Sequence, residues 1–398
     1  MASLPRPTDP RCADVARQHA DSWVGTAGPA VAWVLVEHPG PWPAEIRRLT
    51  EFAGPAGERL FTAAHRHGAR VLAVRRFRER GEQPVDQPRR LAVASQRHGT
   101  TWWTTWSDHR DLLRAAELVT ALDQCGPGAG PAPADREAGP TGEVRTAVGT
   151  WDRDDRQSVL VCTHAQHDPC CARYGREVAS HLHRRFPGVT WQCSHLGGDR
   201  FAGNVLLAPA GTMFGGLDRD SVQALGTLDE LARGRPLDHL RGVCGLSPAA
   251  QASLVAVLRE RPEVSWPDLA LLAEQRLSAN ERLLTWQVPY PEQAAGQTPA
   301  GQAAALIGTA GRGGAAGGPA EHTSTPDGTA TPGKARVPDD GCADRPGDFV
   351  DEVTVRVTSV ARPARMLTCH ALRTAPPITH VADLLRQAPG AGPSGSSA

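Results

Sequence analysis

Two short segments, each preceded by apolar residues, contain an unusual concentration of reactive side chains. The first reads VCTHAQHDPCCARYG, at 161–175, and the second reads WQCSHLGGDRFAGN, at 191–204. Together they contain four of the nine cysteines in 398 residues, with three histidines and two aspartates. Thiolate, imidazole and carboxylate groups are the side chains with which proteins bind transition metals. Two interpretations compete: a metal or cluster site, and a chance grouping of buried thiols.

Each segment follows a predicted strand. RQSVLVCTHA is typical of a short buried strand, CARYGREVASHLHRRF of a helix of about four turns, and GVTWQCS of a second strand. Open α/β sheets gather functional groups at the carboxyl ends of their strands. If the two strands lie side by side, their loops converge. Gly197 and Gly198 would then let the second loop fold tightly around a bound group.

The cysteines of the first segment divide into two groups. Cys162 and Cys171 have eight residues between them and stand at the two ends of the loop. Cys170 is adjacent to Cys171, and vicinal side chains point to different sides, so we expect only one of the two to share a site with Cys162.

The other polar residues of the first segment have simpler interpretations. We interpret His164 and His167 as solvated loop residues, with His164 bonding to backbone. Asp168 precedes Pro169, which is typical of a turn former or a helix cap. No role is assigned to the scattered cysteines, which are Cys12, Cys125, Cys244, Cys342 and Cys369.

The segments VCTHAQHDPCCARYGREVA and SHLGGDRFAGNVLL resemble the sucrase/ferredoxin-like family, a branch of the thioredoxin-like [2Fe-2S] ferredoxins. The resemblance covers most of residues 10–290 and the last predicted strands. It implies an α/β fold: a thioredoxin-like ferredoxin domain with a mixed sheet, preceded by a second small α/β unit. It also implies a one-electron carrier with an unknown redox partner protein. In the family, the first loop supplies two cysteines spaced like Cys162 and Cys171, and the second supplies an H-x-G-G-H pair.

The second loop departs from that pattern at one position. His195 matches the first histidine of the pair, and Asp199 stands where the family has the second. The resemblance therefore implies that Cys162, Cys171, His195 and Asp199 bind a [2Fe-2S] cluster, since a carboxylate can also bind iron. The alternatives for the fourth ligand are Cys193 and Cys170. The motif also includes Arg200, Phe201 and Asn204, which are expected around the cluster. Arg200 would supply a charge, Phe201 an aromatic ring that excludes water, and Asn204 an amide. The alternative for Phe201 is that its ring simply packs in the hydrophobic core.

Two other functions compete with electron transfer. Cys162, Cys171, Cys193 and His195 form a legitimate Cys3His set for a structural zinc module. A thioredoxin-type thiol oxidoreductase is the third hypothesis, but no C-x-x-C stands at a strand-to-helix turn. No pair of carboxylates has the sequence context of a glycosidase acid and nucleophile, so the sequence gives no support for the sucrase activity in the family name.

The chain divides by composition into folded and unfolded stretches. Runs such as AVAWVLVEHPG, ARVLAVRRF, RRLAVASQ and TTWWTTWS predict strands of a first α/β unit, with a helix near 56–68. Gly/Pro-rich composition predicts linkers and disorder. The predicted division is an N-terminal α/β unit at 1–124, a linker at 125–145, the ferredoxin domain with a helical extension at 146–290, a disordered insertion at 291–346, C-terminal strands completing the domain at 347–385, and a disordered tail at 386–398.

Inside the second unit, VLLAPAGTMFGGL predicts a hairpin that turns at Ala210 and Gly211. Residues 218–285 are helical in character, and Ser247 before Pro248 is a plausible N-cap. Near the C-terminus, DEVTVRVTSV alternates like a strand, and ARMLTCHAL is predicted to pair beside it.

The composition of the chain limits the classes of partner that we expect. Lys plus Arg equals Asp plus Glu, at 43 each, so there is no basic field to bind nucleic acid. The N-terminus shows no signal-peptide pattern and the apolar runs are too short to span a bilayer, so we expect a cytoplasmic protein without a membrane partner. In that reducing compartment the cysteines are expected as free thiols or metal ligands.

Overall fold

The structure is a computed structural model that describes six stretches of the chain, at 10–78, 87–125, 143–146, 149–289, 350–370 and 374–385. The predicted insertion at 291–346, the predicted tail at 386–398 and most of the predicted linker lie outside the described residues.

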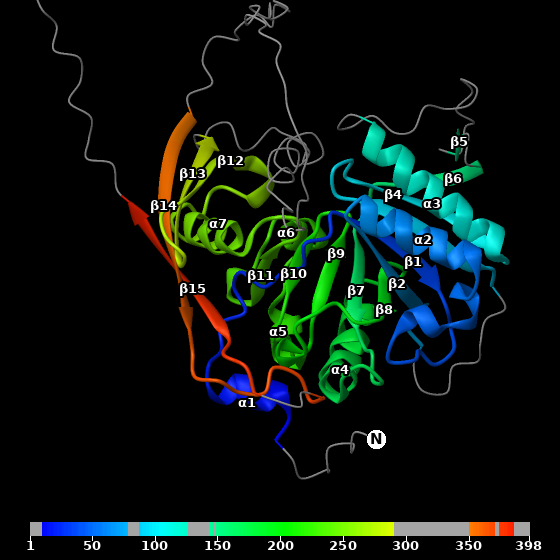
Figure 1. Ribbon diagram of the computed structural model, residues 1–398, viewed down its shortest axis with the longest axis horizontal. Helices are drawn as coiled ribbons and strands as arrows, with labels where there is room; N and C mark the ends of the chain where they lie inside the picture. Colours follow the sequence, from blue (N-terminus) through cyan, green and yellow to red (C-terminus); the bar gives the residue numbers. More distant parts are fainter. Residues whose placement is uncertain are drawn as a thin grey trace, which may run out of the picture.

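The first predicted unit contains parallel and antiparallel strands with two helices on one face. β1 pairs with β2 in parallel and with β3 in antiparallel, and β4 continues the sheet. Helices α2 and α3 lie side by side over these strands (Figure 1). The bounds are α1 Cys12–Gln18, β1 Ala32–Glu37, α2 Pro55–Arg66, β2 Ala69–Arg76, β3 Arg89–Ser95, β4 Thr100–Trp106 and α3 His109–Gln124. Two strands that follow the predicted boundary at 124, β5 Glu143–Thr146 and β6 Gly149–Asp154, extend the same sheet, with β6 beside β4.

The second unit has the strand and helix order that the sequence predicts around the two segments. The predicted hairpin is confirmed: β9 and β10 pair in antiparallel, and Gly211 in the turn has a φ of +76°. Ser247 caps α7 as predicted, because its Oγ accepts a hydrogen bond from the backbone N of Ala250 at 3.0 Å. The bounds are β7 Ser158–Cys162, α4 Pro169–Arg185, β8 Thr190–Cys193, β9 Val205–Ala208, β10 Thr212–Phe214, α5 Arg219–Ala224, α6 Leu228–Ala232, β11 Leu240–Val243 and α7 Pro248–Glu260.

A single mixed sheet runs through both units, which confirms the predicted α/β class. Its strand order is β11-β10-β9-β7-β8-β2-β1-β3-β4-β6-β5. The two units meet where β8 pairs with β2 in antiparallel, so that Cys193 lies opposite Val74. The ends of β7 and β8 therefore lie next to elements of the first unit.

A second sheet, of four strands, corrects two predictions. It has the order β12-β13-β14-β15, with bounds Ala270–Arg276, Glu281–Pro289, Val350–Ala361 and Ile378–Leu385. The stretch 218–285 was expected to be helical, but Leu284, Trp286 and Val288 alternate into the core at 0% exposure, which is the period of a strand. Residues 240–243, in the same stretch, form β11 of the first sheet. The strand that pairs with β14 is 378–385, whereas 364–370 in ARMLTCHAL form an irregular segment with one isolated bridge.

The core and the remaining short elements complete the fold. Helix α7 packs between the two sheets, and buried apolar residues from β7, α4, α7, β13 and β14 form one continuous cluster. Among the described residues, the helices are too short or too polar to cross a membrane. Short 3-10 turns occur at Ile46–Arg48, Thr50–Phe52, Asp199–Phe201, Leu237–His239 and Trp266–Asp268.

Candidate metal centre

Strands β7 and β8 are neighbours and run in parallel, with Cys162 in register with Cys193. The loops that follow them leave the same edge of the sheet. The condition under which the sequence predicted converging loops is therefore met.

The first loop is shaped by the start of α4. The Asp168 side chain accepts a hydrogen bond from the backbone N of Cys170 at 2.7 Å, and Pro169 follows as the first helical residue, so the predicted cap is confirmed. Gly175, six residues after Pro169 in α4, has to be glycine: a Cβ there would lie 1.9 Å from the carbonyl oxygen of Cys162. This close packing of α4 on the end of β7 places Cys171 beside Cys162.

The second loop is held by a buried arginine that sequence reasoning missed. Arg241, on β11, is 2% exposed and donates hydrogen bonds to the Gly197 carbonyl at 2.8 Å and to Asn204 Oδ1 at 2.9 Å. Asn204 in turn donates to the Gly198 carbonyl at 2.9 Å. Gly198 has a φ of +76°, and a Cβ on it would lie 2.6 Å from the guanidinium. An arginine in an arginine-rich chain carries no sequence signal for this role.

The structure brings the four predicted ligands together. The sulfur atoms of Cys162 and Cys171 and a ring nitrogen of His195 all lie within 4.8 Å of one another. Asp199 Oδ1 lies 3.4 Å from Cys171 Sγ and 3.1 Å from His195 Nδ1. We call these four residues the loop cluster. All are buried except His195, whose side chain is 21% exposed.

The two alternative ligands lie outside the loop cluster. Cys193 is fully buried at the end of β8, and its sulfur does not join any group of close ligand atoms among the described residues. Cys170 points to the opposite side of α4, where its sulfur contacts Cys12 and Cys369. The expectation that vicinal cysteines divide between two sides is confirmed.

The two histidines of the first loop differ in exposure: His164 is not the solvated residue that was expected, whereas the side chain of His167 is partly exposed, at 35%. His164 is buried: its Nε2 donates to the Pro43 carbonyl at 2.8 Å, as the predicted backbone bond requires, and its Nδ1 accepts from the backbone N of His195 at 3.2 Å. His167 stacks on His195 with ring centres 3.6 Å apart, and its Nε2 lies 3.8 Å from Asp199 Oδ2. The loop is covered by the chain around Pro43 in the first unit, a contact that no local pattern reveals.

The charges in the loop cluster depend on one another. A hydrogen bond from the Cys171 thiol, and a second interaction with His195, lower the pKa of Cys162 despite its burial. The pKa of Cys171 is raised, because its proton is shared with Cys162. Burial opposes protonation of His195, but Asp199 and Cys162 outweigh it and raise the pKa of His195 to about 9. These shifts favour a thiolate at Cys162, a carboxylate at Asp199 and an imidazolium at His195.

The family is shown by comparison with known proteins. The sucrase/ferredoxin-like family model matches residues 23–236. The chain belongs to this family. No curated protein and no solved structure shows a detectable match.

Three further residues of the sucrase/ferredoxin-like motif hold the surroundings of the loop cluster in place. Asn204 holds loop backbone, as described above. The Arg200 guanidinium lies over the Phe201 ring at 4.2 Å and 3.8 Å from Asp21. Phe201 is 2% exposed and packs edge-on against Trp23. The aromatic ring is therefore part of the core.

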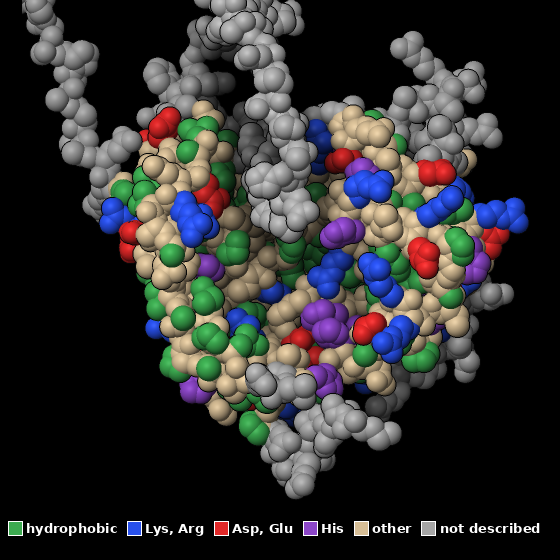
Figure 2. Space-filling model, in the orientation of Figure 1, with side chains coloured by type: hydrophobic (Ala, Val, Ile, Leu, Met, Phe, Trp, Pro, Cys, Tyr) green, Lys and Arg blue, Asp and Glu red, His purple; other side chains and the backbone are tan. Residues whose placement is uncertain are grey.

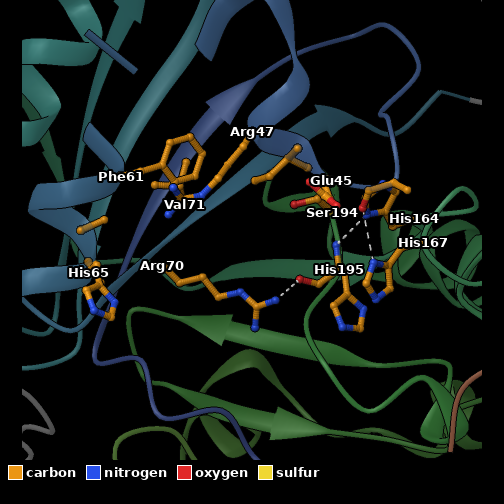
Figure 3. Close-up of a pocket in the computed structure, with 14 residues that line it drawn as sticks. Glu45, Arg47, Phe61, His65, Arg70, Val71, His164, His167, Ser194 and His195 are labelled. Atoms are coloured by element: carbon orange, nitrogen blue, oxygen red, sulfur yellow. Dashed lines mark hydrogen bonds between the residues drawn. The ribbon is translucent and has the colours of Figure 1, made fainter. Parts of the chain in front are cut away.

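A cavity of about 490 Å³ opens beside the loop cluster. His195 and His167 stand at one end, with Arg47, Arg70 and His65 along its walls (Figure 3). Arg70 donates hydrogen bonds to the carbonyl oxygens of His195 and Leu196, which ties this loop to β2. On the face shown in Figure 2, histidine and arginine side chains gather near the middle of the molecule.

Proposed function

We propose that the protein is a one-electron carrier in which the loop cluster holds a [2Fe-2S] cluster. The observation that supports it is the convergence of two thiols, an imidazole and a carboxylate from two neighbouring loops in a ferredoxin-like chain. Cys162 and Cys171 come from the first loop, and His195 and Asp199 from the second, so each loop would supply two of the residues that hold the cluster.

The donor set fits such a group. Thiolate and imidazole are established ligands of [2Fe-2S] centres. The ring nitrogen Nδ1 of His195 is buried and makes no well-aligned hydrogen bond, although Asp199 Oδ1 lies 3.1 Å away. Its interaction with Asp199 is thus an ion pair with poor hydrogen-bond geometry, and metal binding would give this nitrogen a directed partner.

The bound cluster would supply one-electron chemistry, and the chain would set its environment. Imidazole in place of thiolate removes negative charge from the site, which raises the reduction potential relative to an all-cysteine cluster. Arg241 and Asn204 keep the second loop in place, and His164 bonds to its backbone at His195. These contacts restrict how far His195 and Asp199 move when the charge of the site changes.

Two residues compete for the fourth position. Asp199 is our first choice, because its Oδ1 contacts both Cys171 and His195. His167 is the alternative that the structure adds, since its ring nitrogen, that of His195 and an oxygen of Asp199 lie within 4.8 Å of one another.

The cavity is the proposed surface for electron exchange. His195 and His167 are the residues of the site with exposed side chains, at 21% and 35%. Arg47 and Arg70 outnumber Glu45 among the charged residues of the wall, which favours a partner with acidic groups at its docking surface.

A single zinc ion in the loop cluster is the second candidate. It is favoured by the short separation of the three ligand atoms, all within 4.8 Å, which also suits one ion. Cys193 takes no part, so the ligands would be Cys162, Cys171, His195 and Asp199. A thiol oxidoreductase is less well supported, because Cys162 and Cys171 are 1% and 0% exposed.

Anaerobic purification followed by iron, acid-labile sulfide and visible-spectrum analysis tests the proposal. We expect about two irons and two sulfides per chain, with a coloured protein. A colourless protein without iron, in which zinc is lost on Cys162→Ser, would replace electron transfer by the structural role.

A further inference from the structure

Three chain segments that are far apart in the sequence meet at the first turn of α4. Cys12 is the first residue of α1, Cys170 stands in the first turn of α4, and Cys369 lies between β14 and β15. Figure 1 shows α1 and the segment after β14 side by side at the same end of the molecule as α4. All three cysteines are buried, at 0%, 0% and 8% exposure.

Their sulfur atoms form a nearly equilateral triangle. The Sγ–Sγ distances are 3.7 Å between Cys12 and Cys170, 3.5 Å between Cys170 and Cys369, and 3.5 Å between Cys12 and Cys369. Asp168 stands over the triangle, with its Oδ2 3.7 Å from Cys12 Sγ, and the four ligand atoms lie within 4.8 Å of one another. In a tetrahedral zinc site with Zn–S bonds of about 2.3 Å, the sulfur atoms are about 3.8 Å apart.

We propose that Cys12, Cys170, Cys369 and Asp168, here called the terminal cluster, form a second metal site that binds one zinc ion. Three thiolates and a carboxylate in a tetrahedral arrangement are chemistry that suits zinc, whereas magnesium and calcium prefer oxygen ligands throughout.

The surroundings of Asp168 argue against simple packing of thiols. Its carboxylate is 0% exposed, and within the described residues no arginine, lysine or histidine forms an ion pair with it. The carboxylate and the three thiols are all acidic groups, and a cation between them would stabilise the deprotonated forms that bind zinc. Its oxygens accept hydrogen bonds from the backbone N of Cys170 and Cys369, each at 2.7 Å, and from Thr368 Oγ1 at 3.0 Å.

These hydrogen bonds prepare the ligands before a metal arrives. The three bonds to Asp168 orient its carboxylate, as outer contacts do in metal sites. The backbone N of Cys12 donates to Cys369 Sγ at 3.5 Å, which favours a thiolate there.

The consequence of binding would be structural. Zinc at this position would join the first helix and the segment near the C-terminus to the helix turn that carries Cys171. Metal binding that joins remote segments contributes directly to folding free energy. All four side chains of the terminal cluster are buried, so a resident ion fits the site better than a substrate.

Elemental analysis of the full-length protein, purified under reducing conditions, tests the proposal. We expect about one zinc per chain, in addition to any iron. Zinc should be lost in Cys12→Ser and Cys369→Ser. It should remain in Cys171→Ser, which affects only the loop cluster, and in the matched control Cys244→Ser, which removes an isolated buried cysteine.

X-ray absorption at the zinc edge of the wild-type protein gives an answer that does not depend on the folding of any variant. Three sulfur atoms at about 2.3 Å and one oxygen at about 2.0–2.2 Å would support the site. Absence of zinc, a zinc shell with fewer than three sulfurs, or iron in place of zinc at these ligands would overturn it. So would a Cys12–Cys369 disulfide in peptide maps of the freshly isolated protein, or zinc that disappears in Cys171→Ser alone.

Discussion

Cys170 and Cys171 are neighbours in one helical turn, yet they belong to sites of opposite character. The loop cluster, around Cys171, has its proposed ligands on two loops of one unit and lies beside a cavity through which His195 is partly exposed. The terminal cluster, around Cys170, has its proposed ligands on α1, at the start of α4 and between β14 and β15, and all of them are buried. A partly exposed site with a nitrogen donor suits a group that exchanges electrons with a partner. A buried site with three thiols and a carboxylate suits a permanently bound structural ion.

Substitution of the two vicinal cysteines, one at a time, should give the largest change in metal content. Cys171→Ser should abolish iron and sulfide incorporation, because it removes a ligand of the loop cluster, and Cys162→Ser should do the same. Cys170→Ser should retain most of the iron and lose the zinc. Metal and sulfide analysis of the three variants checks this. Equal loss of iron in all three would mean that the two sides of α4 are not independent.

Arg241→Gln should be the most damaging change outside the ligands. Removal of the guanidinium leaves the Gly197 carbonyl and Asn204 Oδ1 without their donors in a buried region, which costs on the order of 3 kcal/mol. Chemical unfolding measures the loss, and iron content shows whether the second loop still holds its ligands. Arg153→Gln, on the exposed surface, is the control and should cost under about 1 kcal/mol. A fully stable Arg241→Gln protein would refute the positioning role.

The two sites should release their metals at different rates. With ferricyanide and a chelator, iron should leave through the exposed side of the loop cluster, while zinc should leave at least roughly tenfold more slowly, because the terminal cluster must open first. Visible absorbance follows the iron and a zinc indicator follows the zinc. Simultaneous release would show that both sites open in one cooperative step.

Asp199→His should keep the cluster and change its spectrum. It restores the family motif at the fourth position, and a neutral imidazole in place of a carboxylate should raise the reduction potential. His167→Ala is the matched variant and should leave both spectrum and potential almost unchanged. If His167→Ala bleaches the protein instead and Asp199→Ala does not, the fourth ligand is His167.

Reversal of one charge at the cavity should have the smallest effect. Arg47→Glu should slow oxidation of the reduced protein by the anion ferricyanide a few-fold at low salt, because attraction of the anion is lost. The cation hexaamminecobalt(III) should show the reverse trend. Stopped-flow measurements at two salt concentrations check this, and equal rates in both proteins would move the exchange surface elsewhere.

Much of the loop cluster was predictable because its parts are local. The apolar runs before Cys162 and Cys193 specify two strands, and Asp168-Pro169 specifies the start of a helix, so the donors at their ends follow from short-range rules. The strands at 270–289 were missed, because a short apolar run is compatible with both a helix and a strand. Only the neighbouring elements with which it packs decide between the two.

By itself, then, the sequence determined the mixed α/β class, the hairpin at 205–214 and the donor types at the ends of two strands, since periodicity and capping act within a few residues. Only the tertiary structure decided that His164 is buried under Pro43, that Arg241 holds the second loop, and that Cys12 and Cys369 meet Cys170. These contacts join residues between 37 and 357 positions apart. No periodic pattern spans such separations, because they are set by how the sheet and its helices pack once the local elements have formed.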